Sequence, residues 1–353
     1  MTYTQTEENL IVFSSFEHLS DRIKHNLVFN CKDSGERKNY AVKTLSVGVY
    51  NNIENSFHSD IYRTQCLESL QKKGIKCVTY LSPEYPEGLK NTDNPPIVLY
   101  CKGNTALLKS NCFSVVGSRR TSAQALTLCK KISGELTSAF TIVTGMAEGA
   151  DSAVIKGAIP SGKVISVLAN GFDFVYPANN RDLIEKVASQ GLLISEYLPH
   201  IRPAKYNFPV RNRIIAGLSK GTLVVSAGVK SGALITADCA LEYGREVFAF
   251  PYSTGVASGA GCNALIKNGA HLTENILDIF QVFGLDLKTS EQTLTLSRDE
   301  TELLNEIKIT GEGFLPQIAQ KLNKFTYQLI PVAVSLEIKG LITRLGGNRY
   351  GIV

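Results

Sequence analysis

A short run in the middle of the chain combines side chains that bind phosphate with the point where a strand gives way to a helix. In the run GSRRT, Gly117 lets a ligand approach the backbone, and Ser118 or Thr121 can cap the helix that follows. Arg119 and Arg120 add guanidinium donors whose geometry matches phosphate oxygens. The free N–H groups and positive dipole at a helix start favour the same ligand. The run is therefore a candidate phosphate-binding loop, and an ordinary capped turn with solvated arginines is the alternative.

Residues 205–213 carry the most informative nucleic-acid signal in the sequence. Among them are three cations, an amide and two aromatic rings that could contact a nucleic acid: Lys205, Arg211, Arg213, Asn212, Tyr206 and Phe208. Aromatic rings stack on bases and cations contact phosphates, which is how proteins hold single strands. Because Arg211 and Arg213 are two positions apart, they do not share a helix face. We expect one of them to contact phosphate and the other to be structural, for example paired with Asp151 or Glu148; a solvated helix face is the alternative.

Two other loops place glycine beside small or polar residues at strand-to-helix junctions. They are TGMAEGAD at 144–151 and KSGALITA at 230–237. The residues in them that would shape or contact a ligand are Gly145, Gly149, Asp151, Lys230, Ser231 and Gly232. Glycine permits a close approach, and a serine before a helix start with free N–H groups suits an anion. Tight packing of helix on sheet explains the first loop equally well, and a plain N-capped helix explains the second.

Patterns that mark enzymes and metal centres do not occur in their required context in this sequence. Residues 157–163, GAIPSGK, fit the first seven positions of a P-loop, but Val164 stands where Ser or Thr is needed and the run precedes a strand. The run GLSKG at 217–221 fits GxSxG, but it follows a helical stretch and precedes a strand, which is the reverse of a nucleophile elbow. There is no HExxH motif, and the eight cysteines and five histidines show no metal-ligand spacing. We therefore predict no catalytic residue, no metal and no cofactor.

An alternation of strands and helices would position these loops. Apolar runs of strand length occur at 113–116, 141–143, 164–168, 192–194, 222–225 and 247–250, and helical stretches at 122–138, 148–159, 180–190, 210–218 and 232–243. Apolar runs that alternate with helices indicate a parallel sheet covered on both faces. We predict an extended Rossmann-like, doubly wound α/β domain with a mostly parallel sheet, whose ligands bind beyond the carboxyl ends of the strands.

The chain as a whole divides into four predicted parts. They are a helical N-terminal region, 1–75; the Rossmann-like domain, 76–284; a linker, 285–297; and a winged-helix domain, 298–353. The last is predicted from three helical stretches followed by a β-hairpin around the Gly346–Gly347 turn. Arg344 and Arg349 make it only weakly basic, so a packing or partner role is as reasonable as duplex binding.

The composition is that of an ordinary globular protein. The 353 residues are 44% hydrophobic and 20% charged, which suffices for sizeable cores in two or three domains. A net charge of +5 is compatible with nucleic acid but does not by itself indicate it. No apolar run approaches the length of a membrane span and the N-terminus has no basic leader, so we expect a cytoplasmic protein without a membrane partner.

The loops, in this order, resemble the DprA/Smf family of DNA-processing proteins over roughly residues 80–280. The matching runs are GSRRT at 117–121, TGMAEGAD at 144–151, DFVYPAN at 173–179, LISE at 193–196, FPVRNRIIAGLS at 208–219, SGALITA at 231–237, GREV at 244–247 and NALIKNGA at 263–270. The FPVRNR and SGALITA runs are specific. The resemblance implies a homodimer that is not an enzyme, binds single-stranded DNA, protects incoming strands and loads the RecA recombinase in natural transformation.

Carried over residue by residue, the resemblance implies a DNA pocket and a set of supporting residues. The pocket would comprise Ser118, Arg119, Arg120, Lys205, Phe208, Arg211, Asn212, Arg213, Ser231 and Gly232, supported by Gly117, Gly145, Gly149, Asp151 and Lys230. Ser226 stands where the family commonly has Glu, and the glycine-rich loop 251–261 replaces a Pro-Gly turn, so the charge balance beside the pocket changes. Two alternatives stay open: a small-nucleotide sensor, and an enzyme of a related Rossmann family that cleaves nucleotide N-glycosidic bonds.

Overall fold

The computed structural model falls into two compact units, residues 1–285 and 286–353, which are described here separately. The described residues are 3–16, 19, 23–24, 26–27, 34–45, 47–48, 51, 55, 59–285 and 296–352. Most of the predicted linker 285–297 lies outside them. Among the described residues, no helix is both long and apolar enough to cross a membrane.

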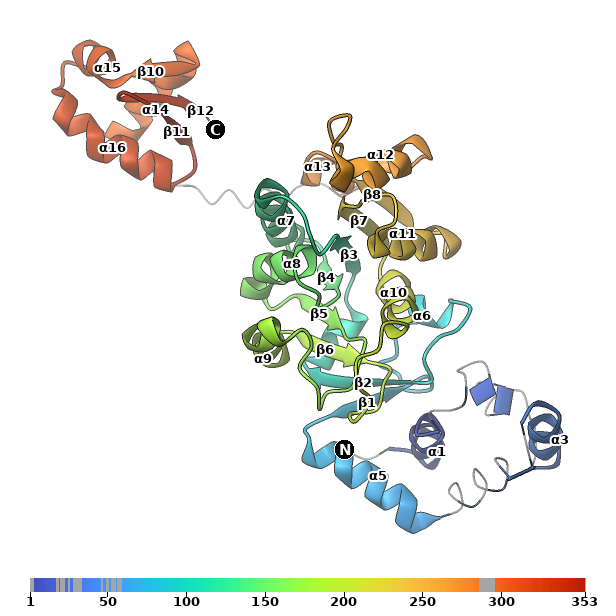
Figure 1. Ribbon diagram of the computed structural model, residues 1–353. Coiled ribbons are helices and arrows are strands. Elements are labelled where there is room, and N and C mark those ends of the chain that lie inside the picture. Colours follow the sequence, from blue (N-terminus) through green and yellow to red (C-terminus); the bar gives the residue numbers. More distant parts are fainter. Residues whose placement is uncertain are drawn as a thin grey trace. The chain divides into compact units, whose positions relative to one another are not determined.

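A nine-stranded sheet forms the centre of the first unit (Figure 1). Its strands are β1 (Lys76–Thr79), β2 (Val98–Gly103), β3 (Cys112–Gly117), β4 (Thr141–Thr144), β5 (Val164–Val167), β6 (Leu192–Ser195), β7 (Gly221–Ser226), β8 (Glu246–Ala249) and β9 (His271–Leu272). They lie in the order β1-β2-β6-β5-β4-β3-β7-β8-β9, with β3 to β9 parallel and β1 and β2 antiparallel. The strand order therefore reverses between β3 and β7, where such sheets bind ligands.

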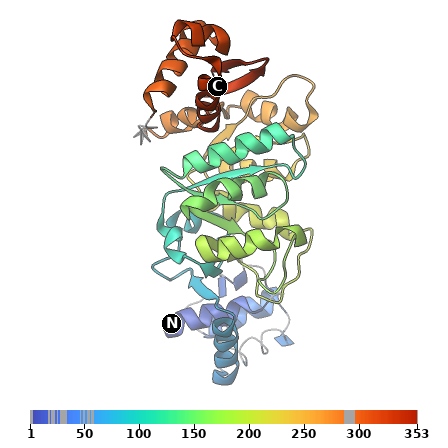
Figure 2. The same cartoon turned by 90° about the vertical axis from the view of Figure 1, so that its left-hand side faces the viewer.

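Helices cover both faces of this sheet. Their bounds are α6 (Glu87–Lys90), α7 (Ala123–Leu136), α8 (Ala150–Ala158), α9 (Arg181–Gln190), α10 (Asn207–Leu218), α11 (Gly232–Glu242), α12 (Ala260–Lys267) and α13 (Ile276–Val282). One buried apolar cluster lies between the sheet and α7, α8, α9 and α13, the face seen in Figure 2, and a second lies under α6, α10, α11 and α12. The predicted doubly wound α/β class is confirmed.

Local sequence explains where the central elements begin. Residues of β3 such as Val115, which is 0% exposed, are covered from both faces, so the strand is a continuous apolar run. Ser122 caps α7 by accepting a hydrogen bond from the Ala125 N–H. The prediction that Ser118 or Thr121 caps this helix is wrong. The Ser118 N–H and hydroxyl are bonded to the end of β7, so the chain runs on to Ser122 before the helix starts.

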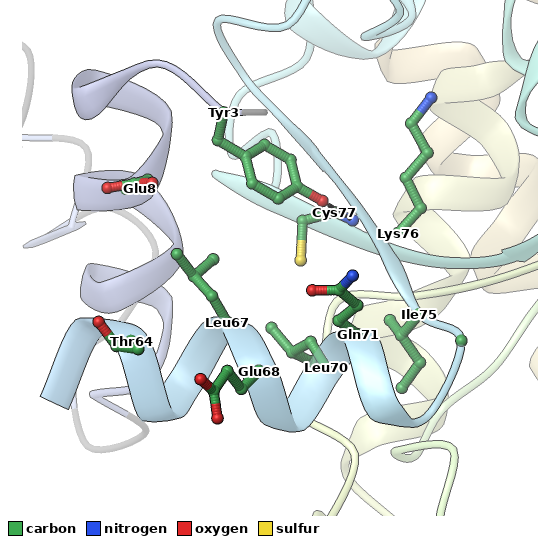
Figure 3. A pocket seen from close by; sticks show the side chains of 11 residues that line it. Tyr3, Glu8, Thr64, Leu67, Glu68, Leu70, Gln71, Ile75, Lys76 and Cys77 are labelled. Carbon is green, nitrogen blue, oxygen red and sulfur yellow. Dashed lines mark hydrogen bonds between the residues drawn. The ribbon is translucent and has the colours of Figure 1, made fainter. Parts of the chain in front are cut away.

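The described part of residues 1–75 is helical, as predicted. It comprises α1 (Gln5–Ser14), α3 (Ser34–Thr44) and α5 (Asp60–Lys72). Tyr3, just before α1, accepts a hydrogen bond from the Cys77 N–H on the free edge of β1, at 3.0 Å. A groove of about 530 Å³ runs between this tyrosine, α5 and β1, with Gln71 directed into it (Figure 3). This region therefore packs against the sheet edge at β1, six strands away from β7.

The second unit is a winged-helix arrangement. It consists of α14 (Arg298–Thr310), β10 (Glu312–Phe314), α15 (Leu315–Lys321), α16 (Thr326–Ile338), β11 (Ile342–Gly346) and β12 (Arg349–Ile352), with the strands in the order β10-β12-β11. Leu303, Ile307, Leu329 and Leu336 are fully buried and join the helices in one core.

The outer face of α16, the helix that enters the major groove in duplex readers, is apolar. Tyr327, Ile330 and Val334 are exposed along it. Five of the seven basic residues among the described residues of this unit are in ion pairs with carboxylates: Arg298, Lys321, Lys324, Lys339 and Arg349. This charge pattern is unlike the basic face of a duplex reader.

Candidate nucleic-acid interface

The predicted loops meet at the carboxyl ends of β3 and β7, around a pocket of about 270 Å³. The predicted site residues that line it are Gly117, Ser118, Arg119, Asp151, Phe208, Arg211, Asn212, Ser231 and Gly232. The others, Arg120, Lys205, Arg213, Lys230, Gly145 and Gly149, are not part of its lining. The structure therefore brings together residues from four separate stretches of sequence, at the point where the strand order reverses.

The helix start that faces this pocket belongs to α11 rather than to α7. Ser231 caps α11, and Gly232 and Ala233, its first residues, line the pocket. The Ser231 hydroxyl lies 3.2 Å from that of Ser118. Ser118 in turn donates its N–H to the Ser226 backbone oxygen, at 2.9 Å. The loop at 117–121 is thus fixed against β7. The positive end of the α11 dipole points toward the space where an anion would lie.

The glycines of these loops are required by packing. A Cβ on Gly117 would lie 2.6 Å from a Val225 methyl carbon and 2.7 Å from the Ala150 Cβ. On Gly145 it would lie 2.3 Å from a carboxylate oxygen of Asp151. Both glycines therefore allow helix α8 and its loop to sit tightly on the sheet, which is the packing alternative weighed for the 144–151 loop.

Arg211 is a buried residue that supports the pocket from below. It is 5% exposed, donates from Nη1 to the backbone oxygen of Val167, and donates from Nε to Asn212 at 3.2 Å. Asp151, which is 7% exposed, is its electrostatic partner and accepts a hydrogen bond from the Ala147 N–H at 3.1 Å. Burial raises the pKa of Asp151, and the positive charge of Arg211 opposes that rise. One of the two arginines is thus paired with Asp151, as the sequence suggested.

Arg213 is also held by a carboxylate, away from the pocket. Its Nη2 lies 2.5 Å from an oxygen of Glu196, and both side chains are mostly buried. The two arginines therefore point to different partners, which agrees with their spacing on α10. Neither of them is the exposed cation of this site.

The exposed cation in the pocket lining is Arg119, and it forms a cluster with two aromatic rings. Its guanidinium carbon lies 5.0 Å from the centre of the Phe208 ring. The Phe208 ring lies 5.5 Å from that of Tyr176, with the planes tilted by 55°. Tyr176 is 37% exposed. Sequence reasoning did not select Tyr176, although it lies in the DFVYPAN run, and Tyr206, the aromatic residue that it did select, is 76% exposed.

This arrangement can bind an anion and a flat ring side by side. Arg119 and the start of α11 offer donors for a phosphate, while Phe208 and Tyr176 offer faces for stacking. Asp151 is buried beneath the pocket and paired, so it is poorly placed to act as an acid or base. Among the described residues, no group of three or more His, Cys, Asp or Glu could hold a metal ion.

The doubly wound sheet, with a pocket at its switch point that is lined by Arg119, Arg211 and Phe208, defines a Rossmann-like α/β protein. The family model described as DNA recombination-mediator protein A matches residues 76–284, and the chain belongs to this family. The resemblance to DprA/Smf proteins is thereby confirmed.

Individual relatives extend over different shares of the chain. Protein Smf of Synechocystis is 40% identical over 253 residues, which are 69% of this chain and 62% of that protein. DNA processing protein DprA of Streptococcus pneumoniae is 40% identical over 200 residues, 56% of this chain and 71% of that protein. The chain thus spans less than two thirds of the Synechocystis relative, and whole-protein functions are considered below as proposals.

Two solved structures are similar to this one. That of DprA from Streptococcus pneumoniae matches with a TM-score of 0.63 and 30% identity, over 80% of this chain and 98% of the other. A structure concerned with the single-stranded DNA binding mode of DNA processing protein A from Helicobacter pylori matches with a TM-score of 0.54 and 29% identity, over 59% of this chain and 95% of the other.

Proposed function

We propose that the pocket at β3 and β7 binds single-stranded DNA, and that the protein protects such strands and delivers them to the RecA recombinase in transformation or recombination. The observation that carries this proposal is that Arg119 and Phe208 line a pocket that also contains a helix start, with Tyr176 beside the Phe208 ring. Family membership supports it, as does the single-stranded DNA binding of the Helicobacter pylori relative.

The chemistry of this cluster favours single strands over duplexes. A base can lie on an exposed ring only when it is unstacked from its neighbours, which a single strand permits and a duplex resists. Arg119 and the α11 start contact the phosphates, which are the same in every sequence. We therefore propose that the pocket binds single strands with little sequence preference. We also propose that the protein is a cytoplasmic homodimer and that binding involves no catalytic step.

Replacing Arg119 with glutamine is expected to weaken binding of a labelled oligo-dT by about tenfold and to reduce the slope of log K against log salt by about 1, because one phosphate contact is lost. Fluorescence anisotropy across a salt series measures both quantities. Lys102→Gln is the matched control, because Lys102 is an exposed cation of β2, far across the sheet. Equal affinity for oligo-dT in all three proteins, or equal binding of the matching duplex by the unaltered protein, would contradict the proposal.

Tyr176 provides a direct test of base stacking, because the chain contains no tryptophan. Tyr176→Trp introduces a lone reporter, and its fluorescence is expected to be quenched as oligo-dT binds, whereas a tryptophan at exposed Tyr327 in the second unit is not. Tyr176→Ala is expected to weaken oligo-dT binding about fivefold or more, and Tyr176→Phe to retain it, since stacking is worth about 1–3 kcal/mol per base. Unchanged fluorescence and unchanged Tyr176→Ala affinity would remove Tyr176 from the site.

A further inference from the structure

A second pocket lies at the amino ends of the strands, opposite the carboxyl ends where the DNA pocket lies, and its lining is cationic. It has a volume of about 630 Å³ and adjoins the amino ends of β3, β7 and β8; we call it the amino-end pocket. Its cations are Lys109, Lys220 and Arg245, each of which comes shortly before one of these strands. The lining contains one carboxylate, Glu87, whose side chain is 78% exposed. The lining of the pocket therefore carries more positive than negative side chains.

The register of the sheet brings two of these cations together. Gly221 pairs with Glu246 across β7 and β8, so Lys220 and Arg245, one position earlier, are also neighbours. The Lys220 N–H donates to the Cys112 oxygen at 2.9 Å, and the Lys220 charge lowers the pKa of the Cys112 thiol against the larger effect of burial. The lysine is therefore held beside the pocket by the strand β3 as well as by β7.

Arg245 is only partly satisfied by the protein. Its Nη2 donates to the Gly88 backbone oxygen at 3.2 Å. Its Nε is buried and has no hydrogen-bond partner among the described residues. A buried donor without a partner calls for an explanation. The backbone contact holds the guanidinium in the lining of the pocket, and a guanidinium held in this way is suited to a bidentate anion.

The remaining lining indicates more than a bare ion. Leu108, Leu218 and Tyr85 add buried apolar surface beside the cations. Three cations beside apolar surface match a ligand that carries phosphate on an apolar or aromatic body. We propose that the amino-end pocket binds a phosphate-bearing ligand, independently of the DNA pocket at the carboxyl ends of β3 and β7. The phosphate could come from a free nucleotide-like compound or from a nucleic-acid backbone.

The test uses the full chain and pyrophosphate as the probe. Pyrophosphate is expected to slow amide hydrogen exchange in residues 83–91 and 218–221 in a saturable manner at constant ionic strength. Arg245→Gln and Lys220→Gln are expected to weaken this protection at least tenfold, whereas Lys102→Gln and Arg119→Gln leave it unchanged. Arg245→Lys, with its melting temperature, shows whether loss of binding reflects loss of the guanidinium or of the fold. The Arg119 variant separates this proposal from the one above.

Comparing pyrophosphate binding with oligo-dT affinity identifies the source of the phosphate. If Arg245→Gln weakens pyrophosphate binding and leaves oligo-dT affinity unchanged, the ligand is a small phosphate compound. If it weakens both, the ligand is a nucleic-acid backbone. The proposal is overturned if pyrophosphate gives no saturable protection and neither variant alters oligo-dT binding, or if protection is equal in the unaltered protein, Arg245→Gln and Lys220→Gln.

Discussion

Arg211→Met is expected to lower the free energy of unfolding of the first unit by about 3–5 kcal/mol, because it leaves the buried carboxylate of Asp151 without its opposing charge. Both side chains are less than a tenth exposed, so water cannot replace the lost partner. Urea denaturation followed by circular dichroism measures the change, with hydrogen exchange assigning the transition to residues 59–285. The matched control is Lys102→Met, which removes an exposed cation from the same sheet and is expected to change stability by less than about 0.5 kcal/mol.

The loss of unfolding free energy in Arg211→Met should depend on pH in a definite direction. Burial already raises the pKa of Asp151 above its ordinary 3.8, and removal of Arg211 raises it further. A carboxyl whose pKa is higher in the folded state stabilises the fold fully below its unfolded pKa, and this contribution disappears as pH rises through the folded pKa. The difference in stability between variant and unaltered protein should therefore shrink as pH falls from 7.5 toward about 4.

A double variant separates the charge effect from the loss of packing. Asp151→Asn in the Arg211→Met background removes the uncompensated charge and is expected to recover part of the lost stability and to abolish its added pH dependence. A deficit for Arg211→Met that stays constant from pH 7.5 to pH 4, or that Asp151→Asn deepens, would show that electrostatic compensation is not the role of Arg211.

The sheet was predictable because each central strand carries its own signal. A strand such as β5 (Val164–Val167) is covered on both faces, so its sequence is almost entirely apolar. In the helices between the strands, apolar residues recur at helical spacing. The order of the strands has no such local signal. It depends on which strands pair over long sequence distances, as β3 does with β7. The two-residue strand β9 (His271–Leu272) was also missed, since two residues hold no period.

The candidate site was predictable as a set of loops but not as a set of contacts. Arg211 and Arg213 look equivalent in sequence, and one of them was expected to contact phosphate while the other was structural. In the structure neither is the exposed cation of the pocket. Their roles follow from distant partners, Asp151 for one and Glu196 for the other, which only the fold brings near. Tyr176 joins Phe208 across 32 positions for the same reason. Spacing alone therefore identifies the candidate region, and tertiary packing decides which of its side chains remain exposed.

Gly149→Ala tests whether the packing of the loop at 117–121 positions Arg119. Gly149 has a φ of +79°, and a Cβ there would lie 2.3 Å from the Arg119 backbone oxygen and 2.8 Å from that of Ser118. Gly244 has a similar φ of +64°, with nothing within 4 Å of a Cβ. Gly244→Ala therefore serves as a comparison with positive φ and no clash, and should cost about 1–2 kcal/mol. Gly149 also has a ψ of −121°, outside the left-handed helical region, so Gly149→Ala combines backbone strain with a clash against rigid backbone and should cost about 2–5 kcal/mol in all.

The same pair of variants links this loop to DNA binding. In Gly149→Ala the backbone of Ser118 and Arg119 must move away from α8, which shifts the guanidinium off the Phe208 ring and weakens oligo-dT binding measured under conditions where the protein is still folded. Gly244→Ala should bind as the unaltered protein does. If Gly149→Ala loses no more stability than Gly244→Ala and retains full oligo-dT affinity, the loop is not rigid. Arg119 would then reach the pocket through its own flexibility rather than through the packing of residues 117–121 on α8.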